Sequence, residues 1–100
     1  MLIYEKLFTW DEVKNRKNAI KHGINFQEAA SVFSDVDAVV LDDMKHSKDE
    51  ARFIIIGNSK HKRLLMVCHC YRGNDELIRI ISARKADEEE IIIYENGGAY

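Results

Sequence analysis

The sequence contains no proline, only five glycines and only two cysteines among its 100 residues. Because proline is absent and no glycine-rich or serine-rich stretch occurs, nothing resembles a linker, and we expect one domain. Cys68 and Cys70 are two positions apart and would point to the same side of a strand, which suits an intrachain disulfide poorly. We therefore expect both to be reduced thiols with a structural role.

The sequence also lacks long apolar runs and an excess of charge of either sign. Its longest apolar segments, such as Leu64 to Cys68, are far shorter than the ~20 residues of a membrane-spanning helix. The start of the sequence does not follow a signal-peptide pattern, so we expect a cytoplasmic protein with no membrane partner. Fifteen Lys and Arg against seventeen Asp and Glu give a formal net charge of −2. A nucleic-acid site must therefore be a local patch.

The sequence does contain enough apolar residues for a core, 46% of the total, arranged in helical and strand patterns. Asp11, Asn25 and Asp87 are placed to cap helices, and Gly23 is placed to end the first one. The predicted helices are 12–22, a short one from Phe26 to Phe33, and 88–95; the predicted strands are 2–9, 38–41, 52–56, 64–71 and 77–83. The order β-α-α-β-β-β-β-α predicts an α+β two-layer domain in which an antiparallel β-meander packs against helices.

The hairpin between the last two strands decides which polar side chains share a face of the sheet. Gly73-Asn74 fits a two-residue turn, which would place His69 opposite Ile78. One face would then carry His69, Tyr71, Ile80, Ser82 and Arg84, and the other Cys68, Cys70, Arg79 and Lys85. A three-residue loop or a bulge would reverse this grouping, so the alternation alone leaves it open.

Several polar residues of the meander have both a functional and a structural interpretation. If helices cover only one face of the sheet, the second face is available for a ligand. Arginines on strands are commonly solvated, and Lys21 and His22 would complement the negative end of the first helix. Cys68-His69-Cys70 suggests a metal ligand set, but no second cysteine pair exists, so structural thiols are favoured and no metal or cofactor is expected.

The pattern resembles the BrnT family of type II toxin–antitoxin toxins, and the resemblance runs in order over nearly the whole chain. The residues that carry it are Phe8-Thr9-Trp10-Asp11, Asn18, Lys21-His22-Gly23, Phe26-Gln27-Glu28-Ala29-Ala30, Val32-Phe33, His46, Glu50-Ala51-Arg52-Phe53, Gly57, His69 and Arg79-Ile80-Ile81-Ser82-Ala83-Arg84-Lys85-Ala86. The resemblance implies a RelE-like ribonuclease that inhibits translation. It also implies a cognate BrnA-like DNA-binding antitoxin that covers the toxin in a hetero-oligomer and reaches operator DNA.

The resemblance also implies roles for particular residues. Arg84 and Arg52 would contact the scissile phosphate, because a planar guanidinium makes bidentate contacts. A histidine would transfer protons, and Glu50 would act as a base or orient Arg52. The catalytic set is thus Arg84, Arg52, His22, Glu50 and His69, and the RNA-binding set is Lys21, His46, Arg79, Ser82 and Lys85. We expect Arg84 at an exposed strand end, where its replacement would hardly change stability.

Two other functions remain open at this point. A catalytically degenerate toxin would bind an antitoxin and modulate operon repression without cleaving RNA; the acidic composition favours this alternative, because phosphate binding needs positive charge. A metal-binding or redox module built on Cys68, His69 and Cys70 is the third class.

Overall fold

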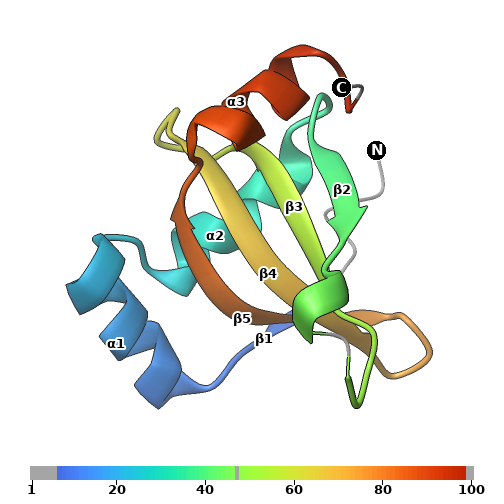
Figure 1. Ribbon diagram of the computed structural model, residues 1–100. Helices are drawn as coiled ribbons and strands as arrows, with labels where there is room; N and C mark the ends of the chain where they lie inside the picture. Colours follow the sequence, from blue (N-terminus) through green and yellow to red (C-terminus); the bar gives the residue numbers. More distant parts are fainter. Residues whose placement is uncertain (1–6, 47, 99–100) are drawn as a thin grey trace.

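Five strands form a single mixed sheet in the order β1-β5-β4-β3-β2. The computed structural model describes residues 7–46 and 48–98, and Figure 1 shows their arrangement. The elements are β1 Leu7–Thr9, α1 Glu12–His22, α2 Phe26–Ser31, the 3₁₀ helix η2 Val32–Ser34, β2 Val39–Asp42, the 3₁₀ helix η3 Met44–His46, β3 Phe53–Asn58, β4 Leu64–Arg72, β5 Leu77–Lys85 and α3 Glu88–Glu95. None of the described helices is long and apolar enough to span a bilayer.

The α+β class is confirmed, and so is the antiparallel meander formed by the last four strands in chain order. The first strand was expected over residues 2–9; its described part is β1, an edge strand that pairs parallel to β5, and residues 2–6 lie outside the described residues. The helix predicted from Phe26 to Phe33 is α2 continued by η2, whereas the sequence did not predict η3.

Helix boundaries agree with the predicted caps. The Asp11 carboxylate accepts hydrogen bonds from the backbone N–H groups of Val13 and Lys14, and Gly23 ends α1 with a φ of 71°. Asn25 caps α2, and Asp87 forms a capping box with Glu90 at the start of α3. These signals act within three or four residues, so the sequence alone is sufficient to place them.

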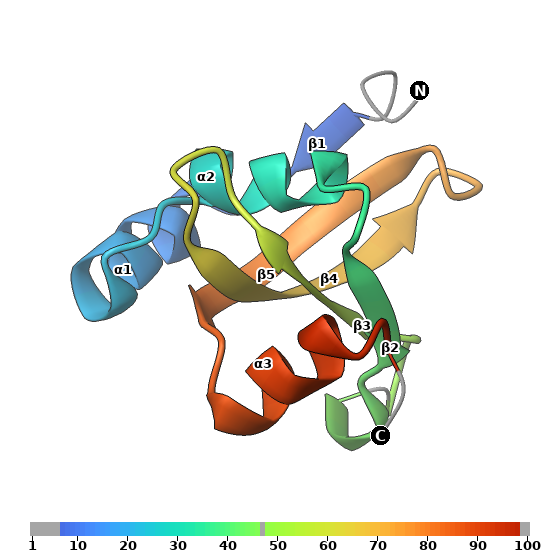
Figure 2. The same cartoon turned by 90° about the horizontal axis from the view of Figure 1, so that it is seen from above.

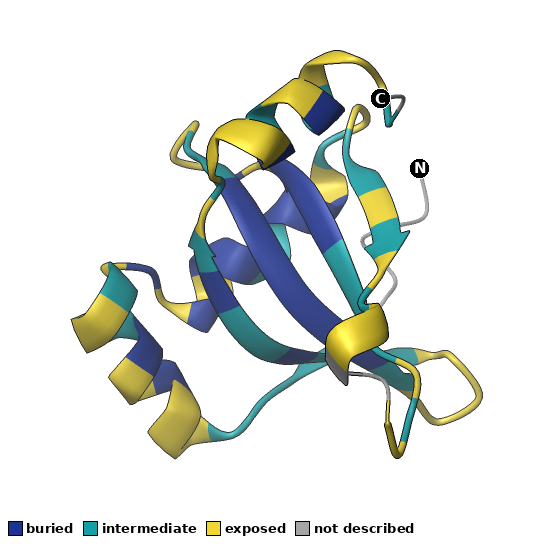
Figure 3. Ribbon diagram, viewed as in Figure 1, coloured by how far each residue is buried: buried dark blue, intermediate teal, exposed yellow. Residues whose placement is uncertain are grey.

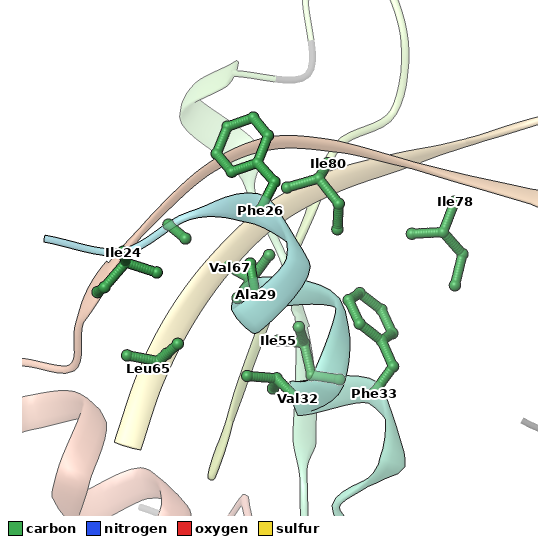
Figure 4. Close-up of a cluster of buried hydrophobic side chains, with 11 residues drawn as sticks. Ile24, Phe26, Ala29, Val32, Phe33, Ile55, Leu65, Val67, Ile78 and Ile80 are labelled. Carbon is green, nitrogen blue, oxygen red and sulfur yellow. The ribbon is translucent and has the colours of Figure 1, made fainter. Parts of the chain in front are cut away.

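Helices cover both faces of the sheet, so the predicted two-layer arrangement with one open face is wrong. Figure 2 shows α2 on one side and α3 on the other. The larger core cluster joins α2 and η2 to the sheet through residues such as Phe26, Val32 and Leu65 (Figure 4). A second cluster packs Ile93 of α3 against Ile56 and Met66 on the opposite face. Because both faces are covered, most of β4 is buried (Figure 3).

The register between β4 and β5 corrects the predicted grouping of side chains. Arg72 pairs with Leu77, so the connection has four residues, 73–76, instead of two. A shift between Cys68 and His69 then inserts one extra residue, Ile81, into β5. His69 still shares its face with Ile80 and Tyr71. The extra residue moves Ser82 and Arg84 to the other face, which also carries Arg79, Cys68 and Cys70.

The side chain of Asn18 links α1 to the edge of β5 through hydrogen bonds. Asn18 Nδ2 donates to the carbonyl oxygen of Ala83 at 2.8 Å, and the N–H of Ala83 donates to Asn18 Oδ1 at 3.2 Å. The same amide nitrogen also donates to the carbonyl oxygen of Ile24 at 2.9 Å. Asn18 therefore satisfies backbone groups of β5 that lie beyond the short β1 strand.

Candidate active site

On the face of the sheet that carries α3, the strand register places polar side chains of neighbouring strands side by side, in rows that run across the strands. Arg79 pairs with Cys70, and Arg52 directly precedes Phe53, the partner of His69. Arg52 and Arg79 therefore flank Cys70, one from each neighbouring strand. In the next row, Ser82 stands beside Cys68. Both arginines are half-buried, whereas Cys70 is buried.

A hollow of about 490 Å³ lies beside this row, at the end of the sheet where β3 begins. Four of its lining residues are cationic and two are acidic. They are Lys45, Lys48, Asp49, Glu50, Arg52 and Arg72. Arg72 Nη2 donates to Glu50 Oε1 at 3.0 Å, and the other cationic side chains of the hollow surround this carboxylate. Such a set of ammonium and guanidinium groups suits a phosphate group.

The two cysteines are free and buried, which confirms the expected reduced, structural thiols. Cys68 Sγ donates to Asp43 Oδ2 at 3.5 Å. Burial raises the pKa of Cys68 to about 11, and the hydrogen bond to Asp43 adds to this effect. Because a thiolate is the form that attacks or binds a metal, this thiol is inert at neutral pH.

His69 lies on the opposite face from the arginine row and is fully buried. Its ring packs between aromatic side chains, with ring centroids 4.9 Å from Phe33 and 5.4 Å from Tyr71. Nδ1 lies 3.3 Å from the carbonyl oxygen of Val67 and donates to it, while Nε2 has no hydrogen-bond partner among the described residues. Burial lowers the pKa of His69, which keeps the imidazole neutral.

The position of His69 also separates it from the two cysteines that flank it in the sequence. Cys68 and Cys70 point to the other face of the strand, so the three side chains do not converge. Within residues 7–46 and 48–98, no group of three or more His, Cys, Asp or Glu side chains is placed to hold a metal ion.

Arg84 shares a face of the sheet with Arg79 and Ser82, but its guanidinium already forms hydrogen bonds within the protein. Its Nη1 and Nη2 atoms donate to the two carboxylate oxygens of Glu90 at 2.9 and 3.0 Å. Glu90 belongs to α3 and is buried. Arg84 lies at the end of β5 as expected, but its bidentate fork ties β5 to α3, so we no longer expect its replacement to leave stability unchanged.

The remaining predicted residues lie apart from the hollow or outside the described side chains. Lys21 and His22 end α1, which lies along β5 at the edge of the sheet (Figures 1 and 2). Lys85 is exposed at the end of β5. The backbone of His46 ends η3, but its side chain lies outside the described part of the structure. Of the sequence-derived candidates, Glu50 and Arg52 line one hollow, and Arg79 and Ser82 lie on the same face of the sheet as Arg52.

Four lining residues of the hollow were not among the predicted site residues. Arg72 ends β4, while Lys45, Lys48 and Asp49 lie in the connection between β2 and β3. The sequence signal for Lys45 and Lys48 was the basic charge around His46 in an otherwise polar segment.

Comparison with known proteins agrees with the fold. A protein family described as "Ribonuclease toxin, BrnT, of type II toxin-antitoxin system" matches residues 10–90. The chain is also similar to the crystal structure of the Brucella abortus ribonuclease toxin, BrnT, with 26% sequence identity and a TM-score of 0.62, and the match covers 83% of this chain and 99% of that one. A search of curated proteins finds no match. The chain therefore belongs to the BrnT family of ribonuclease toxins of type II toxin–antitoxin systems.

Proposed function

We propose that this chain is a metal-independent endoribonuclease toxin that holds the scissile phosphate between Arg52 and Arg79. The observation that carries the proposal is the row in which these two arginines flank Cys70 beside the basic hollow. Arg84 also faces this side, but its fork is already bound by Glu90. Arg52 lines the basic hollow and Arg79 lies in the same row, so these two are our candidates for the phosphate contact.

The proposed reaction is attack of a ribose 2′-oxygen on the adjacent phosphorus. The 2′-O–P bond forms, the P–O5′ bond breaks, the 2′-hydroxyl proton goes to a base and the 5′-oxygen receives a proton. The guanidinium groups stabilise the charge that develops on the phosphoryl oxygens. Glu50 is our candidate base, oriented by its hydrogen bond from Arg72.

His46 is our candidate for protonating the leaving oxygen, because imidazole titrates near neutral pH. Its neighbours Lys45 and Lys48 both line the hollow. The buried position of His69 and the location of His22 at the end of α1 make them weaker candidates. Lys21, Lys85 and Ser82 are left with RNA-binding roles outside the phosphate contact.

The toxin class implies an antitoxin partner. We propose that a BrnA-like DNA-binding antitoxin covers the site in a hetero-oligomer and carries the pair to operator DNA. The free toxin, with a RelE-like mode of action, inhibits translation in the cytoplasm.

The second candidate function is a degenerate toxin that only binds the antitoxin. The net charge of −2 and the two carboxylates in the hollow favour it.

The test compares purified wild type with Arg52→Ala and Arg52→Lys in RNA cleavage and thermal melting. The alanine variant should cleave about 10²–10³-fold more slowly, taking the loss of one charge-stabilising donor as the scale. The lysine variant should recover little, because an ammonium group lacks the guanidinium fork. Arg16→Ala, in the exposed part of α1, is the matched control and should cleave like the wild type.

Two results would contradict the proposal. One is full cleavage by Arg52→Ala, and the other is a loss of cleavage that is explained by a collapse of its melting temperature. A third measurement separates the degenerate-toxin alternative: the wild type is induced without its antitoxin and amino-acid incorporation is followed. Undiminished incorporation at confirmed soluble expression would favour a partner without catalytic activity.

A further inference from the structure

A second hollow, of about 520 Å³, meets the basic one at Glu50, at the same end of the sheet. Its two aromatic rings lie on the face that carries His69, opposite the face of Arg52. Its lining differs in character, because it combines two aromatic rings with two carboxylates. The lining residues are Glu50, Ala51, Phe53, Tyr71 and Asp75. Glu50 lines both hollows, so a ligand that spans this side chain would reach both. The volume lies in the range typical of small-molecule sites.

We propose that this second hollow, the base pocket, binds a guanine base of the RNA whose phosphate occupies the basic hollow. The proposal rests on the proposed ribonuclease function and extends it to the choice of substrate sequence. Three observations carry it: the aromatic pair, the carboxylates and the shared Glu50.

The aromatic pair provides a surface for stacking. Phe53 and Tyr71 have ring centroids 5.4 Å apart at an interplanar angle of 62°. Both rings are half-buried, and the fully buried ring of His69 packs against both of them from behind. Rings that are fixed in this way stack on an unpaired base at little entropic cost. Every base has a stacking face, so this contact explains base binding without explaining a preference.

The carboxylates provide the preference. Asp75 offers two oxygens that accept hydrogen bonds and, when ionised, donate none, while Glu50, the candidate base, adds negative charge beside them. Guanine presents two adjacent donors on its Watson–Crick edge, at N1 and at the exocyclic N2. Uracil presents a single donor flanked by two carbonyl oxygens, which two carboxylates repel. The base pocket therefore fits guanine best.

The charges of the two hollows also orient a nucleotide. The basic hollow has four cationic side chains against two carboxylates, whereas the lining of the base pocket has two carboxylates and no cation, so a phosphate is attracted to the basic hollow. A bound nucleotide should therefore lie with its phosphate on one side of Glu50 and its base on the other.

Asp75→Asn is a sharp probe of the base pocket, because it replaces one carboxylate oxygen by an N–H₂ donor at nearly constant shape. Asp75 lies in the β4–β5 connection with a φ of 69°, a conformation that asparagine tolerates well. Glu76→Gln is the matched control: Glu76 is the next residue, is exposed and does not line the pocket.

The first measurement is calorimetric binding of guanosine and uridine 5′-monophosphates, which does not depend on cleavage. Wild type and Glu76→Gln should bind the guanosine nucleotide about tenfold more tightly than the uridine nucleotide, and Asp75→Asn should lose most of this ratio. The second measurement is sequencing of cleavage sites on random RNA. Wild type should cut beside guanosine, and Asp75→Asn should cut with less preference.

The stacking contact is tested by a pair of variants at one position, each checked by thermal melting. Tyr71→Leu should weaken the binding of both nucleotides without changing their ratio, and Tyr71→Phe, which keeps the ring, should weaken it less. Glu76→Gln, outside the pocket, is the control that should bind both nucleotides like the wild type. Equal binding of the two nucleotides by the wild type, or an unchanged ratio in Asp75→Asn, would overturn the base pocket. If Arg52→Ala abolishes cleavage in the same preparations, the ribonuclease function stands and only the base pocket fails.

Discussion

At the scale of single residues, Arg84 illustrates how one hydrogen-bond pattern changes the expected outcome of a substitution. Its side chain is 37% exposed, while the side chain of Glu90 is 10% exposed. Glu90 Oε1 also accepts the backbone N–H of Asp87 at 2.9 Å, which completes the capping box of α3. Removing Arg84 therefore leaves a buried carboxylate with only the backbone partner.

We predict that Arg84→Ala lowers the free energy of unfolding by about 1–3 kcal/mol, the usual worth of a charged hydrogen-bonded pair. The double variant Arg84→Ala/Glu90→Gln should recover part of this loss, because the unpaired charge is removed. Urea denaturation of the four proteins in the cycle measures the coupling. An unchanged free energy of unfolding combined with lost RNA cleavage would instead return Arg84 to the phosphate site.

At the scale of elements, a buried ionic contact joins α2 to the loop between β3 and β4. Glu28 accepts hydrogen bonds from Arg63 Nε at 2.9 Å and from Ser59 Oγ at 2.7 Å, and Arg63 Nη2 binds its other oxygen. Arg63 also donates to the carbonyl oxygen of Gly23 at 3.0 Å. The contact fixes the corner between α1 and α2 against the sheet.

This contact makes stability depend on pH in a predictable direction. Hydrogen bonding to Arg63 is the main cause that lowers the pKa of Glu28 below its ordinary value. The contribution of Glu28 is therefore fully present above the unfolded-state pKa, near about 4.3, and is lost as the pH falls through the lower folded-state pKa. We predict that Glu28→Gln lowers the free energy of unfolding at pH 7 by about 1–3 kcal/mol.

The measurement is the free energy of unfolding between pH 3 and pH 7 for the wild type, Glu28→Gln and the exposed control Glu89→Gln. The wild type and the control should lose stability in acid more steeply than Glu28→Gln. Parallel curves for the wild type and Glu28→Gln would show that Glu28 does not contribute to the acid sensitivity.

The sequence predicted the helices better than the faces of the sheet, for a physical reason. Caps such as Asp11 and Asp87 act over three or four residues, so their signal is local. The extra residue at Ile81 and the four-residue β4–β5 connection depend on pairing between whole strands, and one residue of shift moves every later side chain to the other face. The side of the sheet on which α3 packs is likewise decided by tertiary packing and not by a local sequence signal.

The same distinction applies to the candidate site. Arg52, Glu50 and Arg79 were identified from the family resemblance, and the structure places Arg52 and Arg79 on one face. Arg72 was missed because its proximity to Glu50, 22 positions away in the sequence, exists only after β3 and β4 have paired.

At the scale of the whole molecule, a local basic surface occurs on a chain of net negative charge. Lys45, Lys48, Arg52 and Arg72 surround one hollow, although the chain carries a net charge of −2. Local cations of this kind attract a phosphate chain even when the overall field does not.

We predict that RNA cleavage continues in excess EDTA, because guanidinium groups take the charge-stabilising role that a metal ion plays in other nucleases. Cys68→Ser combined with Cys70→Ser should retain most activity. Cleavage is measured with and without EDTA for both proteins. Loss of activity in EDTA, restored by a divalent cation, would contradict the prediction.

The pairing of β1 with β5 constrains the order in which the molecule is assembled on the ribosome. β1 is the first described strand of the sheet, yet its partner is the last strand to be synthesised. The backbone partners of Asn18 lie 65 positions later in the sequence. The N-terminal half of the nascent chain therefore cannot complete its contacts with the sheet until β5, which also contains Arg79, has been synthesised. A prematurely terminated chain that ends before β5 has neither a complete sheet nor both arginines, so an aborted translation product cannot form the proposed site.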